Sequence, residues 1–203
     1  DDGNGESNRG AVHIHFLNSS GGVNRTVEIN DTTSNGPFLE NTDRYGSSIA
    51  NLGDLDLDGI QDIAVGAIGN NNTGAMHISF LYQNGSVKST VEINTTTSNG
   101  PSLLNGDIYG RSITNLGDLD LDGIQDIAVG DTGNDGSGTD RGVVYISFMY
   151  RNGSVKSTVE INDTIPNGPV LANDDRYGRS ITNLGDLDGD GIQDIAIGAM
   201  NDD

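Results

Sequence analysis

Cysteine is absent from the chain, which excludes a disulfide framework and a thiolate metal site. Apolar residues make up 33% and aromatic residues 5% of the 203 positions, too little for the long apolar stripes of a helical bundle. The sequence has no run of about 18 apolar residues, so we expect no membrane-spanning segment. The first residues, Asp1 to Asn4, do not resemble a signal peptide. We expect them to start a mature chain or a cut fragment.

Positive charge is also scarce. The 10 Lys and Arg residues face 30 Asp and Glu residues, which gives a formal net charge of −20. The electrostatic field of this negative charge repels nucleic acid phosphates and anionic membrane surfaces. We therefore expect neither nucleic acid as a partner nor insertion into a membrane.

Glycine and internal repetition are abundant. The chain has 30 glycines, and the sequence of residues 51–66, NLGDLDLDGIQDIAVG, recurs unchanged at 115–130. Residues 183–198 repeat it with two differences, Gly189 and Ile197. Repetition at this period indicates an array of similar structural units. We expect one continuous segment over residues 1–203, with units of approximately 1–66, 67–130 and 131–203.

Each unit has the pattern of four short strands. In the central copy they are expected at about 109–116, 126–130, 142–150 and 157–162, and the third alternates apolar and polar residues as a half-buried strand does. An Asn-Gly pair at Asn152 signals a hairpin turn between the third and fourth strands. Four antiparallel strands repeated at this spacing predict an all-β fold of propeller blades.

The phase of the repeat divides the blades unequally. The chain starts just before a third strand, at 11–17, and ends just after a second strand, at 194–199. We therefore expect two whole blades and two complementary half blades. Because propellers close with four to eight blades and unpaired strand edges are avoided, we expect a head-to-tail homodimer that completes a six-bladed ring. The alternative is that the chain is part of a longer protein.

An acidic loop precedes the second strand of each unit. In the first loop Asp54, Asp56 and Asp58 occupy positions 1, 3 and 5, Gly59 position 6 and Asp62 position 9. Ca²⁺ prefers six to eight oxygen ligands, and alternating aspartates in a tight loop can direct several carboxylates at one point. Four aspartates this close repel one another without a cation. The same pattern in all three units predicts three Ca²⁺ sites.

The predicted ligands are the four aspartates and the main-chain carbonyl at position 7 of each loop. They are Asp54, Asp56, Asp58, Ile60 and Asp62; Asp118, Asp120, Asp122, Ile124 and Asp126; and Asp186, Asp188, Asp190, Ile192 and Asp194. Position 12 is Val or Ile where an EF-hand requires Glu, which excludes that motif. Mg²⁺ fits less well than Ca²⁺, because it requires strict octahedral geometry that this many flexible carboxylates do not provide. Zn²⁺ fits poorly because the loops offer it no nitrogen or sulfur ligands.

The blocks Tyr109 to Ile113, Asp118 to Asp126 and Ile127 to Gly130 resemble the FG-GAP repeat of integrin alpha-subunit β-propellers. Tyr-Gly stands in the place of Phe-Gly, and Val-Gly-Ala in the place of Gly-Ala-Pro. The resemblance extends over essentially the whole chain and implies that the loop carboxylates bind Ca²⁺. The near-identical units are typical of a recent duplication, a microbial integrin-like protein or a designed sequence.

Other polar residues carry weaker signals. His13 and His77 share a position that is Tyr145 in the third copy, which favours a packing or surface role. We expect four arginines beside the Tyr-Gly starts to pair with nearby aspartates: Arg44, Arg111, Arg176 and Arg179. Eight Asn-x-Ser/Thr triplets would accept glycans in a secretory pathway or reflect composition alone. They start at Asn18, Asn24, Asn30, Asn71, Asn84, Asn94, Asn152 and Asn162.

Three functions fit these observations. The first is a non-catalytic, calcium-binding extracellular or cell-surface module that mediates protein or glycan interaction, as in adhesion. The second is a purely structural or engineered propeller without a ligand. The third is an accessory propeller of a secreted hydrolase or lyase. We expect no catalysis by this chain, because no catalytic constellation stands apart from the acidic loops.

Overall fold

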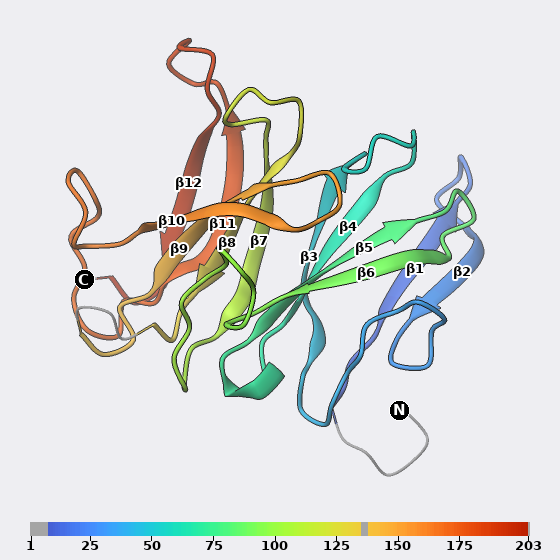
Figure 1. Ribbon diagram of the computed structural model, residues 1–203, viewed down its shortest axis with the longest axis horizontal. Helices are drawn as coiled ribbons and strands as arrows, with labels where there is room; N and C mark the ends of the chain where they lie inside the picture. Colours follow the sequence, from blue (N-terminus) through green and yellow to red (C-terminus); the bar gives the residue numbers. More distant parts are fainter. Residues whose placement is uncertain (1–7, 135–137, 203) are drawn as a thin grey trace.

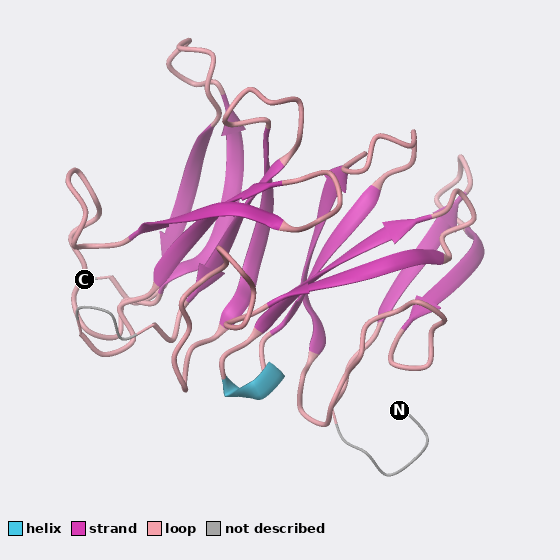
Figure 2. Cartoon of the chain, in the orientation of Figure 1, coloured by secondary structure: helices cyan, strands magenta, loops and turns pink. Residues whose placement is uncertain are grey.

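The computed structural model describes residues 8–134 and 138–202. These residues form strands joined by turns, with a single turn of 3₁₀ helix, η1 (Asn70–Asn72) (Figure 2). The strands form two sheets of four and two sheets of two, all antiparallel and paired in chain order. The four sheets fan out side by side along the chain (Figure 1). This arrangement is a partial β-propeller.

The two-stranded sheet at the start of the chain contains β1 (Val12–Leu17) and β2 (Val23–Ile29). The first whole blade consists of β3 (Tyr45–Gly53), β4 (Asp62–Ala67), β5 (Ala75–Leu81) and β6 (Val87–Ile93). The second consists of β7 (Tyr109–Gly117), β8 (Asp126–Asp131), β9 (Val143–Met149) and β10 (Val155–Ile161). The last sheet contains β11 (Tyr177–Gly185) and β12 (Asp194–Ala199).

The predicted fold class and the phase of the repeat are both confirmed. The chain holds two whole blades. The half blade at its start contains the third and fourth strands of a blade, and the half blade at its end contains the first and second strands. The predicted strand limits of the central copy agree with β7, β8 and β9 to within one residue, whereas β10 starts two residues earlier than expected, at Val155. The loop between β8 and β9 is four residues longer than its counterpart in the first blade, and residues 135–137 lie outside the described residues.

The hydrophobic core lies between the sheets. The largest buried cluster joins the two whole blades and includes Leu52, Ile78, Tyr109 and Ile127. The second strands are the most enclosed, because both of their faces are covered: Ile127, Ala128 and Val129 of β8 are all 0% exposed. The corresponding residues of β12 are only partly buried or exposed, since the last half blade is covered on one side alone.

The first strand of each repeat unit, β3, β7 or β11, lies closest to the neighbouring sheet and is called its inner strand. Neighbouring inner strands approach one another closely. The Ser48 hydroxyl donates to the Gly110 carbonyl at 2.7 Å, and the Ser112 hydroxyl donates to the Gly178 carbonyl at the same distance. A Cβ atom on Gly66 would lie 2.1 Å from the Gly110 oxygen. Glycine is therefore required at this position, because any side chain would force neighbouring blades apart.

Asparagine side chains close many of the turns. The Asn84 Oδ1 atom accepts hydrogen bonds from the Ser86 amide at 2.9 Å and the Ser86 hydroxyl at 2.7 Å. The same pair of bonds forms within the triplets that start at Asn18, Asn30, Asn94, Asn152 and Asn162. Asn followed two residues later by Ser or Thr is thus selected here by turn geometry. These triplets need no glycan to explain them.

No helix in the described ranges is both long and apolar enough to cross a membrane.

Candidate metal centre

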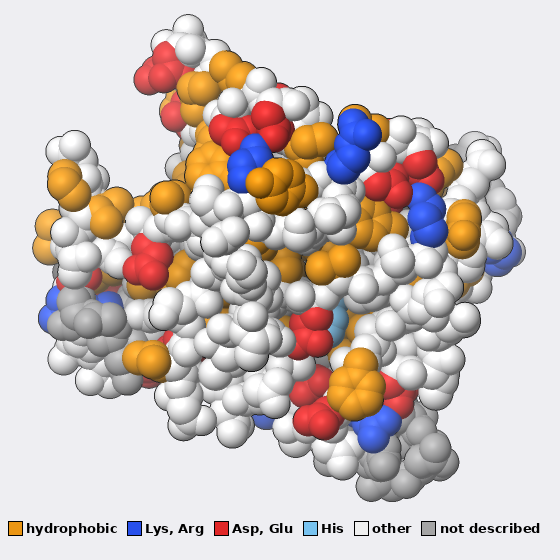
Figure 3. Space-filling model, in the orientation of Figure 1, with side chains coloured by type: hydrophobic (Ala, Val, Ile, Leu, Met, Phe, Trp, Pro, Cys, Tyr) orange, Lys and Arg blue, Asp and Glu red, His pale blue; other side chains and the backbone are white. Residues whose placement is uncertain are grey.

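The three acidic loops occupy equivalent places in the fold. Each connects an inner strand to the second strand of the same sheet: β3 to β4, β7 to β8 and β11 to β12. All three loops lie at the upper edge of the molecule in Figure 1. The space-filling view shows acidic and basic side chains gathered along the same edge (Figure 3).

The first loop is curled by its own aspartates. The two carboxylate oxygens of Asp54 accept the amide protons of Asp58 and Gly59, each at 2.8 Å. Asp58 in turn accepts the amide proton of Ile60 at 2.8 Å. Gly59 has a φ of 91°, a conformation that glycine adopts without strain. The alternation of aspartates and the glycine therefore specify this turn locally.

The other two loops repeat this geometry. In the second loop Asp118 accepts from Asp122 at 2.8 Å and from Gly123 at 2.7 Å. In the third loop Asp186 accepts from Asp190 and Gly191, both at 3.0 Å. The two position-6 glycines have φ angles of 90° and 92°. The three loops therefore share one backbone conformation.

Three carboxylates gather in each loop, with one oxygen from each lying within 4.8 Å of the others. The groups are Asp54, Asp56 and Asp58; Asp118, Asp120 and Asp122; and Asp186, Asp188 and Asp194. Oxygens that share one Ca²⁺ lie at about 2.3–2.6 Å from the ion, and so at most about 5 Å from each other. Both the spacing and the all-oxygen donor set fit Ca²⁺.

The position-9 aspartates lie deeper than the others. Asp62 is fully buried, and its carboxylate accepts the amide protons of Leu55 at 3.1 Å and Leu81 at 3.0 Å. Burial raises the pKa of Asp62, and the two amide hydrogen bonds oppose that rise. Asp126 repeats the arrangement with Leu119 and Met149. This carboxylate ties its loop to the third strand of the blade.

In the third loop the position-9 side chain is placed differently. Asp194 accepts from Leu187 at 2.7 Å and joins the carboxylate group in which the first two loops use position 5. Its half blade has no third strand from this chain. The role of every predicted residue as a ligand remains a prediction, including the roles of Asp62, Asp126 and Asp190 and of the Ile60, Ile124 and Ile192 carbonyls.

A lysine lies against each of the first two carboxylate groups. The Lys88 ammonium from β6 contacts Asp56 at 2.7 Å and also Asp58, and Lys156 from β10 contacts Asp120 at 2.7 Å and also Asp122. The Lys88 hydrogen bond, aided by the Ile60 amide, lowers the pKa of Asp58. The clusters therefore attract positive charge. Sequence reasoning missed both lysines, although they are the only two in the chain and occupy the same position of identical segments.

The histidines lie apart from the loops. His77 is buried and packs edge-on against Tyr45, with 5.5 Å between ring centres. Tyr109 and Tyr145 form the equivalent pair at 5.6 Å, which confirms the expected packing role of His77. His13 is exposed and stacks on His15.

Comparison with known proteins supports the repeat assignment. The family model for the FG-GAP repeat matches residues 177–203, the segment that contains β11, the third loop and β12. Integrin alpha-3 of Cricetulus griseus is 30% identical over 207 aligned positions, which cover 95% of this chain and 17% of that protein. Integrin alpha-4 of Xenopus laevis is 31% identical over 159 positions, or 78% of this chain and 14% of that protein.

Integrin alpha-2 of Mus musculus is 35% identical over 99 positions, which cover 48% of this chain and 8% of that protein. The chain therefore spans less than a fifth of the length of these integrin subunits. The resemblance found in the sequence is confirmed: the chain is built from FG-GAP repeats of the integrin alpha type.

Proposed function

From its FG-GAP repeats, we propose that this chain is a non-catalytic propeller module that binds one Ca²⁺ in each of its three acidic loops. The observation that carries the proposal is the gathering of three carboxylates within 4.8 Å in every loop. The amide hydrogen bonds hold these loops in one shape, so a cation would meet a preformed set of oxygens.

The ion would connect two neighbouring strands. In the first blade Asp54 directly follows β3 and Asp62 begins β4. An ion held by this loop joins the ends of both strands, and Asp62 extends the connection to Leu81 of β5. Because Ca²⁺ binds the folded loop better than the unfolded one, it stabilises the blade by mass action.

We propose that the module acts outside the cell or at its surface and mediates adhesion to a protein or glycan. The similarity to integrin alpha subunits supports this. A propeller without a ligand would bind Ca²⁺ equally well but would bind neither a protein nor a glycan. An accessory propeller would require a catalytic domain encoded in the same reading frame.

Thermal melting with and without Ca²⁺ tests the metal proposal. At free Ca²⁺ about tenfold above the dissociation constant, each site adds about 1.4 kcal/mol to the stability of the fold. Three sites then raise the melting temperature by roughly 10 °C for a chain of this size. The variant Asp120→Asn should lose about a third of that shift. Glu160→Gln, which removes an exposed carboxylate of β10, should keep it. An unchanged melting temperature in EDTA would refute calcium binding.

We propose further that the two half blades are completed by a second copy of the chain, as a six-bladed homodimer. What supports it is the apolar surface left open on the last half blade: Leu187 is 74% exposed, whereas its equivalent in the first blade, Leu55, is 0% exposed. The first and last sheets supply complementary strand pairs of the same blade type.

Sedimentation equilibrium in millimolar Ca²⁺ tests the dimer. A mass of two 21.2 kDa chains is expected. A single-chain mass would overturn the homodimer and leave the half blades to neighbouring repeats of a longer polypeptide.

A further inference from the structure

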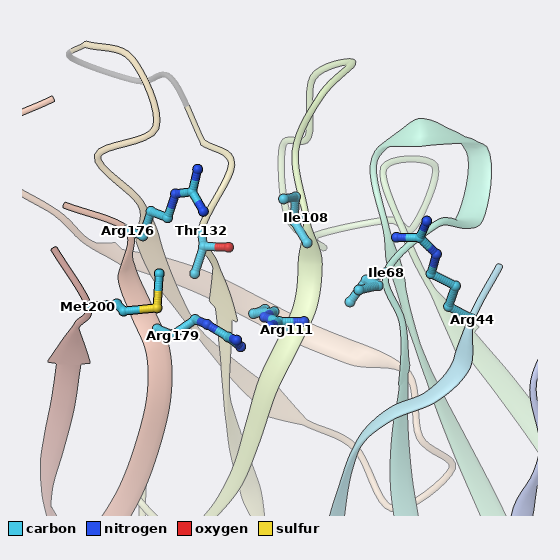
Figure 4. Close-up of a pocket in the computed structure, with 8 residues that line it drawn as sticks. All are labelled: Arg44, Ile68, Ile108, Arg111, Thr132, Arg176, Arg179 and Met200. Atoms are coloured by element: carbon cyan, nitrogen blue, oxygen red, sulfur yellow. The ribbon is translucent and has the colours of Figure 1, made fainter. Parts of the chain in front are cut away.

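Four arginines line one hollow at the end of the inner strands opposite to the acidic loops. The hollow has a volume of about 300 Å³, and its walls include Arg44, Arg111, Arg176 and Arg179 (Figure 4). The whole chain has only 10 Lys and Arg residues and a net charge of −20. Four of its ten cationic side chains therefore surround one small space.

The register of the inner strands brings two of these arginines side by side. The Ser112 hydroxyl of β7 donates to the Gly178 carbonyl of β11, which fixes how the two strands align. Arg111 follows Gly110 in β7, and Arg179 follows Gly178 at the equivalent position of β11. Figure 4 shows the Arg179 side chain extending toward Arg111. The equivalent position of β3 is Ser47.

These positive charges have few protein counter-charges. Among the described residues, only Arg176 of the four forms an ion pair, a long one with Asp140 at 3.8 Å. The expectation that these arginines pair with nearby aspartates is therefore wrong for Arg44, Arg111 and Arg179 within the ranges that the structure describes. Partial burial lowers the pKa of Arg111, and the positive charges of Arg179 and Arg176 lower it further.

The acidic loops are too distant to neutralise the arginines. Arg111 lies near the start of β7 and the second loop follows its end at Gly117. Six residues of extended strand span about 20 Å, which exceeds the screening length of about 8 Å at physiological salt. The nearer carboxylates, Asp43, Asp107, Asp131 and Asp175, are buried beside wall residues in the sequence, and within the described ranges none of the four forms an ion pair with these arginines.

We propose that this hollow binds a tetrahedral oxyanion, a sulfate or phosphate group, either free or carried as an ester. Each guanidinium presents a rigid fork of donors that matches such an anion. A carboxylate offers two oxygens and is satisfied by one fork, whereas a tetrahedral group offers oxygens to several arginines at once. The paired charges of Arg111 and Arg179 therefore favour the tetrahedral group.

The remaining wall is suited to the organic part of an ester. Ile68, Ile108 and Met200 line the hollow beside the arginines, and the Thr132 hydroxyl offers an additional hydrogen bond (Figure 4). Apolar side chains exclude water next to the charges, which strengthens their attraction for an anion. They also provide a surface against which an alkyl or aryl group can pack.

The test uses the calcium-loaded chain and follows the arginine Nε–Hε signals by NMR. Sodium sulfate replaces sodium chloride at constant ionic strength, and sodium acetate is titrated in parallel. Sulfate should shift the Arg111 and Arg179 signals saturably, whereas acetate should not saturate over the same range. 4-Nitrophenyl phosphate, an ester that is mostly a dianion at neutral pH, distinguishes the two sources of the group. Tighter binding of this ester indicates an ester ligand, and equal or weaker binding indicates the free ion.

The repeat itself supplies the variants. Arg111→Ser and Arg179→Ser introduce the residue that β3 carries at this position, Ser47, so the blade should fold. Each should weaken sulfate binding about tenfold, the loss expected for one charged hydrogen-bonding partner. Arg151→Gln is the matched control, because the equivalent turn residue of the first blade is Gln83. The proposal is overturned if sulfate produces no saturable shift, or if Arg151→Gln weakens binding as much as Arg111→Ser does.

Discussion

Asp131 offers the sharpest test of how this fold tolerates charge in its core. It ends β8 and is 0% exposed, and the equivalent residues of β4 and β12 are Ala67 and Ala199. One carboxylate oxygen accepts the amide protons of Ile108 at 2.8 Å and Gly133 at 3.2 Å. Burial, and then the negative charge of Asp107, raise the pKa of Asp131 from its ordinary 3.8 to about 7, against the effect of these hydrogen bonds.

The sign of the pH effect follows from this rise. The folded chain holds the Asp131 proton more tightly than the unfolded chain does, so raising the pH from about 4 to 7 removes stability. Above pH 7 the fold contains a buried, ionised carboxylate. One pKa unit corresponds to about 1.36 kcal/mol, so the difference between 3.8 and about 7 amounts to an upper limit of about 4 kcal/mol.

Asp131→Asn removes the ionisation and keeps an oxygen for the two amide donors. We expect the variant to match the wild type near pH 4 and to be more stable at pH 8, by up to about 4 kcal/mol. Urea unfolding in saturating Ca²⁺ at pH values from 4 to 8 measures the difference. Glu28→Gln, which neutralises an exposed carboxylate of β2, should stay within about 0.5 kcal/mol of the wild type throughout. Parallel stability curves for Asp131→Asn and the wild type would refute the reasoning.

Two further predictions follow from differences between equivalent positions. Leu55→Ala should lower the free energy of unfolding by about 2–4 kcal/mol because Leu55 is fully buried, whereas Leu187→Ala should lower it by less than about 0.5 kcal/mol in the single chain. Urea unfolding of both variants at low protein concentration tests this, and equal losses would contradict it. Lys88→Asn, which introduces the residue found at this position of β2, Asn24, should raise the Ca²⁺ affinity of the first loop several-fold, because the ammonium and the ion compete for Asp56 and Asp58. Calorimetric titration measures the affinity, and a weaker site would show that the lysine supports binding.

The sequence predicted the blades well because their signals are local. The glycine of each loop, the alternating apolar residues of β9 and the Asn-Gly turn at Asn152 specify conformation within a few residues. Their repetition in three units removed the usual uncertainty about where each strand begins. The start of β10 was misplaced by two residues, because Val155 and Lys156 look like part of the turn, although Val155 already pairs with Met149 of β9 and Lys156 lies at the register shift that follows.

Contacts between sequence-distant residues could not be predicted in this way. Lys88 lies 30 and 32 residues from the aspartates that it contacts, and only the lateral order of β3 to β6 brings them together. The pairing of Arg111 and Arg179 was misjudged for the same reason: composition suggests that an aspartate is always within reach, but the strands separate both side chains from the acidic loops, and no ion pair forms with either within the described residues. The burial of Asp131 likewise depends on the covering of β8 by both neighbouring sheets.

The close contact at Gly66 has a consequence for how such arrays evolve. Since a Cβ atom there would lie 2.1 Å from the carbonyl oxygen of the next inner strand, the missing side chain sets how tightly neighbouring wedges converge on the axis. The arc that one wedge subtends determines how many of them complete a circle. A Cβ atom on Gly130 would likewise lie 2.0 Å from the Gly178 oxygen, so the two units share the same arc. Copying a gene segment can therefore lengthen or shorten the polypeptide while the circumference of the finished circle stays constant.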